Sequence, residues 1–215
     1  MLKYFHNNQI IKQNNIFYID SCNCGKAIMH NIEAHIAHGQ VAHPTKYPWI
    51  VRLFFKTTKR NIIGRPVISN KPICTGSLVT EQHVLTAAHC ISHPGAPGRY
   101  TVYVGNDMNN PLKVERINVH ESFNKECYPL KCEGHDVAVL TMKYLYPDGI
   151  PICLPSNPGA SYDGHTAVEA GYGFDEHGKH GFGASKGARP GGPQLLETSV
   201  VIVSSSQCSH QWRKE

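Results

Sequence analysis

His89 and Asp136 are the residues whose types and surroundings point most directly to chemistry. His89 lies near the end of a segment bounded by Cys74 and Cys90, and an imidazole fixed there can act as a general base. Asp136 stands at the head of the apolar run 137–140. Taken alone, the histidine could be an ordinary core residue and the carboxylate could cap a strand. Their flanking residues make both of them candidate catalytic groups.

The elements that must position these groups are strands and loops. Short apolar runs separated by Gly, Pro and Asn are typical of a β-sandwich or β-barrel. The runs cover residues 49–55, 78–85, 100–104, 114–119, 137–141 and 196–203. Around His89 we expect a strand, a turn and a second strand, which cysteines at both ends can fix. Catalytic groups would then lie on strand ends and loops of a rigid scaffold.

The composition indicates a globular protein without a membrane span. The chain has 215 residues, of which 40% are hydrophobic and 17% charged. Its longest apolar run, residues 49–55, is interrupted by Arg52 and falls far short of the roughly 20 residues that a spanning helix needs. Eight widely spaced cysteines suit disulfides formed in an oxidising compartment. We therefore expect a secreted protein, although residues 1–20 show no apolar signal-peptide centre.

A cluster of basic residues follows the first apolar run. It consists of Lys56, Lys59, Arg60, Arg65 and Lys71, in a chain whose formal net charge is +5. We interpret it as a solvated hairpin loop, and a patch that steers acidic substrates or sulfated sugars is the alternative. No nucleic-acid partner is expected, because the sequence has neither aromatic residues interleaved with basic ones nor a recognisable reader helix.

Several segments resemble, in order, the landmarks of trypsin/chymotrypsin-like serine proteases. They are Ile36–Ala42, Tyr47–Leu53, Cys74–Cys90 with the histidine motif, His135–Leu140 with the aspartate motif, Pro151–Pro155, Ala170–Gly173 and Leu195–Val203. The resemblance implies an all-β fold of two six-stranded antiparallel β-barrels, the first complete and the second partial. It divides the chain into a propeptide-like segment (1–35), the first barrel (36–149), and the inter-barrel crossing with an incomplete second barrel (150–215).

The resemblance also implies a role for each candidate residue. His89 would take the proton of a serine hydroxyl, and Asp136 would hold the tautomer of His89 and stabilise its charged form. Ile36 matches the amino terminus freed on activation of the zymogen, although His35 replaces the usual Arg or Lys before the cut.

The family's nucleophile motif, Gly-Asp-Ser-Gly-Gly, does not occur in the 215 residues. We therefore expect this chain to be a truncated product or fragment that is inactive by itself. A group of serines near the end lacks the Gly-rich turn of a nucleophile and is expected at exposed strand ends or in loops. These are Ser204, Ser205, Ser206 and Ser209.

Two disulfides follow from the resemblance, and a four-residue insert between two further cysteines could make a third, small loop. The pairs are Cys74 with Cys90, Cys24 with Cys153, and Cys127 with Cys132. Zinc binding by Cys22, Cys24 and nearby histidines is the alternative, but their irregular spacing fits no established zinc site. We expect neither a metal nor another cofactor.

The hypothesis is a secreted trypsin-like serine endopeptidase that, in its complete form, hydrolyses peptide bonds through an acyl-enzyme. Polypeptide substrates and protease inhibitors are the expected partners. The alternative is a non-catalytic serine protease homologue that acts as a binding or regulatory protein.

Overall fold

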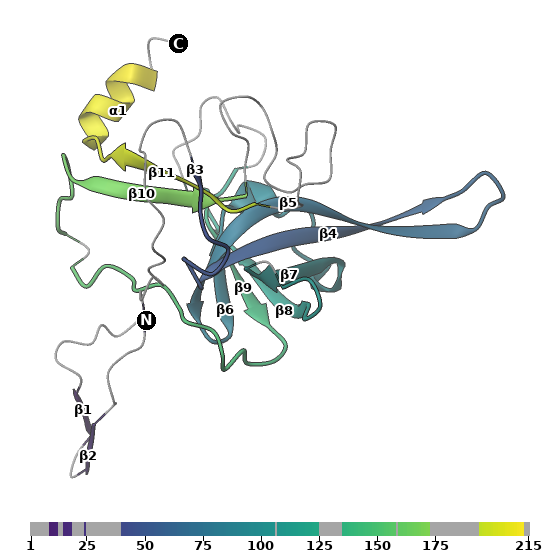
Figure 1. The fold of residues 1–215 in the computed structure, drawn as a ribbon, viewed down its shortest axis with the longest axis horizontal. Coiled ribbons are helices and arrows are strands. Elements are labelled where there is room, and N and C mark those ends of the chain that lie inside the picture. The colour runs from purple at the N-terminus through teal and green to yellow at the C-terminus, as the bar shows by residue number, and fades with distance from the viewer. Residues whose placement is uncertain are drawn as a thin grey trace.

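The computed structural model contains a closed β-barrel and a smaller sheet (Figure 1). It describes residues 9–12, 15–18, 24, 40–105, 107–124, 135–157, 159–172 and 194–212. Near the N-terminus, strands β1 (Gln9–Lys12) and β2 (Asn15–Tyr18) form an antiparallel hairpin of their own. The remaining strands belong to the barrel and to the smaller sheet.

Six strands close the barrel in the order β4-β5-β6-β9-β8-β7. They are β4 (Ile50–Arg60), β5 (Pro66–Thr80), β6 (His83–Thr86), β7 (Tyr100–Val104), β8 (Leu112–Val119) and β9 (Ala138–Met142). Every neighbouring pair is antiparallel, and the pairing of β4 with β7 completes the ring. Because closure pairs the strand edges, the barrel gives its end loops a rigid base.

Apolar side chains from all around the ring fill the barrel. Leu78, Val84, Val102 and Leu140 are fully buried. Burying each of them contributes roughly 1.5–3 kcal/mol. Gly76 allows β5 to approach β6 closely, since a Cβ atom there would lie only 2.8 Å from the carbonyl oxygen of Leu85. The barrel core is therefore the main source of stability among the described residues.

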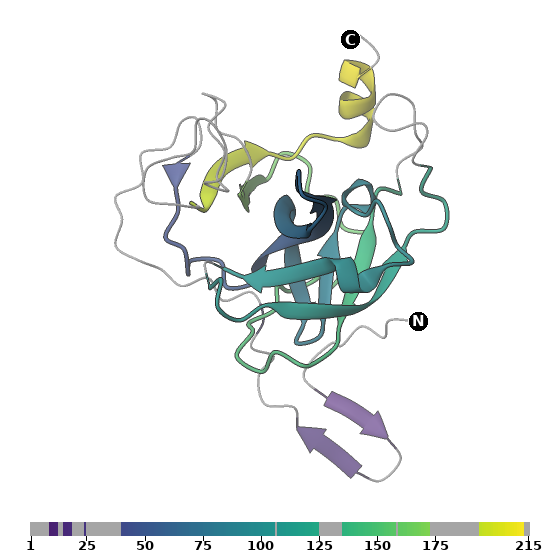
Figure 2. The ribbon, with the colours of Figure 1, turned by 90° about the vertical axis from the view of Figure 1, so that its right-hand side faces the viewer.

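The smaller sheet has three strands in the order β10-β11-β3, with antiparallel pairing throughout. They are β3 (Gln40–Val41), β10 (Thr166–Gly171) and β11 (Leu196–Val201). In Figure 2 this sheet and helix α1 lie on one side of the barrel. Val168, Val200 and Val201 are exposed on it. The predicted all-β fold, with a complete first barrel and a partial second one, is confirmed.

Buried polar contacts join the sheet to the barrel side of the molecule. The carboxylate of Glu197 accepts hydrogen bonds from Lys46 Nζ at 2.8 Å and from Tyr47 OH at 2.5 Å. Tyr172, at the end of β10, packs against the buried guanidinium of Arg52, whose Cζ lies 5.0 Å from the ring centroid. Burial raises the pKa of Tyr172 to about 12. The phenol therefore stays neutral beside the Arg52 cation.

Helical structure is sparse in the described residues. Two short 3₁₀ segments occur, η1 (Ala88–Cys90) and η2 (Pro97–Arg99), with one α-helix, α1 (Ser205–Trp212). Ser204 caps α1, because its Oγ accepts a hydrogen bond from the amide of Gln207 at 3.2 Å. Ser205, Ser206 and Ser209 lie within α1, so the expectation that they lie in a loop or strand end is wrong. Within the described residues, no helix is long and apolar enough to cross a membrane.

Candidate active site

His89 is presented by the short η1 turn that follows β6. A threonine-based turn joins β5 to β6, in which Thr80 Oγ1 accepts hydrogen bonds from the amides of Gln82 and His83. After β6 ends, Ala88 and Cys90 are buried on either side of His89. This anchoring directs the imidazole outward, and 37% of its side chain remains exposed.

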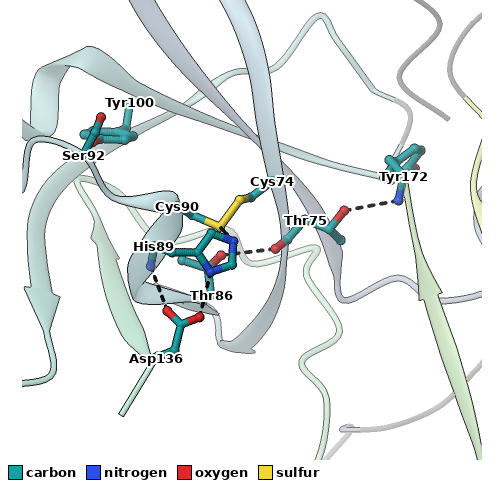
Figure 3. Close-up of a disulfide and its surroundings, with 9 residues drawn as sticks. All are labelled: Cys74, Thr75, Thr86, His89, Cys90, Ser92, Tyr100, Asp136 and Tyr172. Carbon is teal, nitrogen blue, oxygen red and sulfur yellow. Dashed lines mark hydrogen bonds and ion pairs between the residues drawn. A yellow bond between two sulfur atoms is a disulfide. The ribbon is translucent and has the colours of Figure 1, made fainter. Parts of the chain in front are cut away.

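A disulfide between Cys74 and Cys90 ties η1 to β5, with 6.1 Å between the Cα atoms (Figure 3). A second link lies beside it, because Thr86 Oγ1 donates to the carbonyl oxygen of Thr75 at 3.1 Å. The segment that carries His89 is thus joined to the barrel wall by a covalent bond and by a side-chain hydrogen bond. Such double attachment restricts the positions that the imidazole can adopt.

Strand register brings Asp136 to the same end of the barrel. β9 pairs antiparallel with β6, and Ala138 lies opposite Thr86. Asp136 precedes Ala138 and His89 follows Thr86, so both leave the barrel where these two strands meet. His135 adopts a left-handed conformation with φ 63°, which a non-glycine residue rarely takes. Its ring stacks on His120 at a centroid distance of 4.5 Å, which supports the turn before Asp136.

The Asp136 carboxylate binds His89 through both of its oxygens (Figure 3). Oδ1 accepts a hydrogen bond from the His89 backbone N–H at 2.8 Å, and Oδ2 lies 2.7 Å from the imidazole Nδ1. Burial is the largest single influence on the pKa of Asp136 and raises it, but the hydrogen bonds and charge of His89, with a backbone hydrogen bond from Ala88, together outweigh burial and lower the pKa. An ionised carboxylate can only accept, so Nδ1 carries the proton and donates it to Asp136.

This tautomer decides which nitrogen of His89 can act as a base. With the proton on Nδ1, the lone pair of the neutral imidazole lies on Nε2. Nε2 is 3.6 Å from Cys90 Sγ, and a disulfide sulfur has no proton to donate. The arrangement can therefore accept a proton at Nε2 and stabilise the resulting imidazolium through the Asp136 carboxylate.

Metal binding is not favoured by the one cluster of ligand types found in the described residues. Cys74, His89 and Cys90 place their ligand atoms within 4.8 Å of one another. Both sulfurs belong to the disulfide, so neither is available as the thiolate that zinc prefers.

The other sequence-predicted residues are spread over the rest of the chain. Cys24 and Cys153 form a disulfide with a Cα separation of 5.1 Å. Ile36 and the cysteines Cys127 and Cys132 lie outside the described residues. Cys208 is a free thiol.

Sequence reasoning missed the supporting role of Thr75. Its hydroxyl accepts a hydrogen bond from the Tyr172 amide at 3.2 Å, while its carbonyl holds Thr86. Thr75 thus connects the smaller sheet to the wall beside His89. Its position directly after Cys74 is the one signal that could have marked it.

Comparison with known proteins identifies relatives of this chain and its family. Coagulation factor XII of Rattus norvegicus is 28% identical over 202 residues, which cover 86% of this chain and 29% of that protein. Venom serine protease Bi-VSP of Bombus ignitus is 26% identical over 197 residues, covering 83% of this chain and 48% of that protein. The chain thus spans less than half the length of these relatives. Residues 36–215 match the trypsin family model, and the chain belongs to the trypsin family.

Proposed function

We propose that the whole protein is a serine endopeptidase in which His89 is the general base and Asp136 orients it. The observation that carries this proposal is the double contact of the Asp136 carboxylate, 2.8 Å to the His89 amide and 2.7 Å to Nδ1. Family membership supports a peptidase and polypeptide substrates.

The proposed reaction uses Nε2 of His89 as the proton carrier. As a serine hydroxyl attacks the scissile carbonyl, Nε2 takes its proton, and the imidazolium that forms is stabilised by Asp136 at 2.7 Å. The same proton then passes to the leaving amine, so the bond breaks and an acyl-enzyme remains. The Gly-Asp-Ser-Gly-Gly motif is not among the 215 residues. The 215-residue chain by itself is proposed to be inactive, and the whole protein would supply the serine.

Secretion and activation are part of the same proposal. The disulfides Cys24–Cys153 and Cys74–Cys90 are typical of proteins that mature in an oxidising compartment. A cut before Ile36 would release a new amino terminus. Cys24 would then remain bound to Cys153, so the preceding segment would stay attached to the protease domain.

A phosphonate probe that labels activated serines tests the proposal. The whole protein, isolated from its natural source, should be labelled after activation. Its recombinant His89→Ala variant should lose labelling, and His165→Ala, which removes a histidine of the smaller-sheet region, should not. The 215-residue chain should stay unlabelled.

Two outcomes would contradict this assignment. Labelling of the 215-residue chain would show that another nucleophile is present. A stably secreted whole protein that resists labelling after activation would favour the non-catalytic homologue instead.

A further inference from the structure

The hairpin formed by the far ends of β4 and β5 projects from the barrel without a neighbouring strand. We call residues Lys56–Lys71 the arm. The pairing of β4 with β7 stops at Phe55, whereas the pairing of β4 with β5 continues to Arg60 and Pro66. At about 3.4 Å per residue, these extra pairs reach roughly 17 Å beyond the barrel. Figure 1 shows the arm extending away from the barrel and from the smaller sheet.

The tip of the arm is apolar, although hairpin turns are usually polar. Ile62 is fully exposed at 105% and Ile63 is 67% exposed. On the adjoining strand, Val67 is 48% exposed and Ile68 is 64% exposed. Four large aliphatic side chains therefore meet water at one projecting end, where they add nothing to the core.

The backbone of this tip satisfies much of its own hydrogen bonding. The Asn61 amide donates to the carbonyl oxygen of Arg65, and the Gly64 amide donates to that of Asn61, both at 2.9 Å. The Asn61 side-chain oxygen accepts from the amides of Ile63 and Arg65, at 3.1 and 2.9 Å. Internally paired amides lose little when they leave water, so this turn can enter an apolar medium at low cost.

The arm is basic along its length, and its stretch of sequence contains no acidic residue. The arm carries Lys56, Lys59, Arg60, Arg65 and Lys71, and no aspartate or glutamate occurs anywhere in residues 34–80. Arg60 Nη1 donates to the carbonyl oxygen of Gly64 at 3.1 Å, which holds its guanidinium at the turn that carries Ile62 and Ile63. Charge and apolar surface thus meet at the same end of the arm.

We propose that the arm docks this protein on membranes rich in anionic phospholipid, with Ile62 and Ile63 inserted at the headgroup and acyl-chain boundary. Arg60, Arg65 and Lys59 would then lie at the level of the lipid phosphates, to which they are attracted. An acidic peptide or a sulfated sugar could engage the cations, but it would leave both isoleucines in water. An anionic membrane would bind the cations and also bury the two isoleucines. Docking in this way does not require catalysis.

Co-sedimentation of the 215-residue chain with phospholipid vesicles tests the proposal. Vesicles of phosphatidylcholine with phosphatidylserine should bind the chain, and vesicles of phosphatidylcholine alone should bind it far more weakly. The double variant Ile62→Ser and Ile63→Ser should weaken binding by about a hundredfold, since each buried aliphatic side chain contributes about tenfold. The triple variant Lys59→Gln, Arg60→Gln and Arg65→Gln should lose about fivefold for each cation.

Tyr144 and Leu145 provide the matched control. They are 65% and 59% exposed and follow Lys143, but they lie outside the arm. Replacing both with serine should leave vesicle binding unchanged. Insertion itself is measured with Ile63→Trp, whose fluorescence should be quenched by bromine-labelled lipid more strongly than that of the unsubstituted chain.

Three results would overturn the proposal. The first is absence of binding to the anionic vesicles. The second is vesicle binding that the isoleucine variant retains in full. The third is binding to heparin or polyglutamate that depends on the cations while Ile63→Trp shows no quenching by lipid, which would assign the arm to an acidic polymer.

Discussion

The closed barrel and the three-stranded sheet are both built from antiparallel strands, yet they bury their side chains differently. In β9, four of five residues are buried, whereas in β10 none is. The barrel pairs every strand with two neighbours, while β10 and β3 form the ends of an open sheet. For β9 and β10, pairing within a closed ring goes with burial and a position at an open edge goes with exposure.

The candidate site follows the same division. His89 and Asp136 both leave the closed barrel at the end of the β6–β9 pair. The smaller sheet contributes supporting contacts, through the Tyr172 amide to Thr75 and through Glu197 to Lys46 and Tyr47. The closed barrel thus holds the His89–Asp136 pair, and the smaller sheet contacts the outside of the barrel region.

The largest expected effect tests whether the barrel's site performs the chemistry. In the whole, activated protein, Asp136→Asn should lower kcat for peptide hydrolysis by about 10⁴-fold, because an amide cannot fix the correct His89 tautomer. Asp163→Asn, in a turn beside the smaller sheet, should leave kcat unchanged. Steady-state kinetics on a peptide substrate measures both variants. Equal losses of kcat would contradict the assignment of catalysis to the barrel site.

Two truncations compare the barrel core with the exposed face of the smaller sheet. Leu140→Ala removes a fully buried side chain from the barrel and should lower the free energy of unfolding by about 2–5 kcal/mol. Val201→Ala, on the exposed part of β11, should change it by less than about 0.5 kcal/mol. Urea unfolding followed by circular dichroism checks this difference. A large loss in Val201→Ala would mean that β11 is buried in solution.

The cysteines allow a similar contrast. Replacing both Cys74 and Cys90 with alanine opens a loop with a sequence separation of 16 and should cost roughly 3 kcal/mol of unfolding free energy. Cys208→Ala removes a free thiol in α1 and should cost far less. Guanidinium unfolding under non-reducing conditions measures both. If the double variant unfolds at the same midpoint as the unsubstituted chain, the disulfide does not stabilise the barrel.

The smallest effect concerns pH. The folded pKa of Asp136 is lowered, so its stabilising contribution is present above the unfolded value of about 3.9 and is lost as pH falls through the folded value. Because Asp136 is 29% exposed and His89 37% exposed, we expect less than about 1 kcal/mol. Unfolding free energies measured from about pH 6 to about pH 3 should fall less in Asp136→Asn than in the unsubstituted chain. Parallel curves would show no net contribution from the pair.

Much of the fold was predictable because the strands carry local signals. The predicted runs 100–104 and 114–119 match β7 and β8 closely. The run 49–55 predicted only half of β4, since its far half pairs through polar residues of the arm that carry no apolar pattern. Helix α1 was missed because it is short and lacks a clear apolar face. Its Ser204 and Gln207 do fit the capping-box spacing, which was the available signal.

The residues by themselves determined the β class, the family and the two groups that the site brings together. Which residues do chemistry is a matter of side-chain type and local motif, and these are visible along the chain. Only the tertiary structure decided that the Asp136 carboxylate reaches both the amide and Nδ1 of His89, that Arg52 and Glu197 are buried, and that Ile62 stands at a projecting tip. Such facts depend on strand register and barrel closure, which bring together residues far apart in sequence and leave others without neighbours.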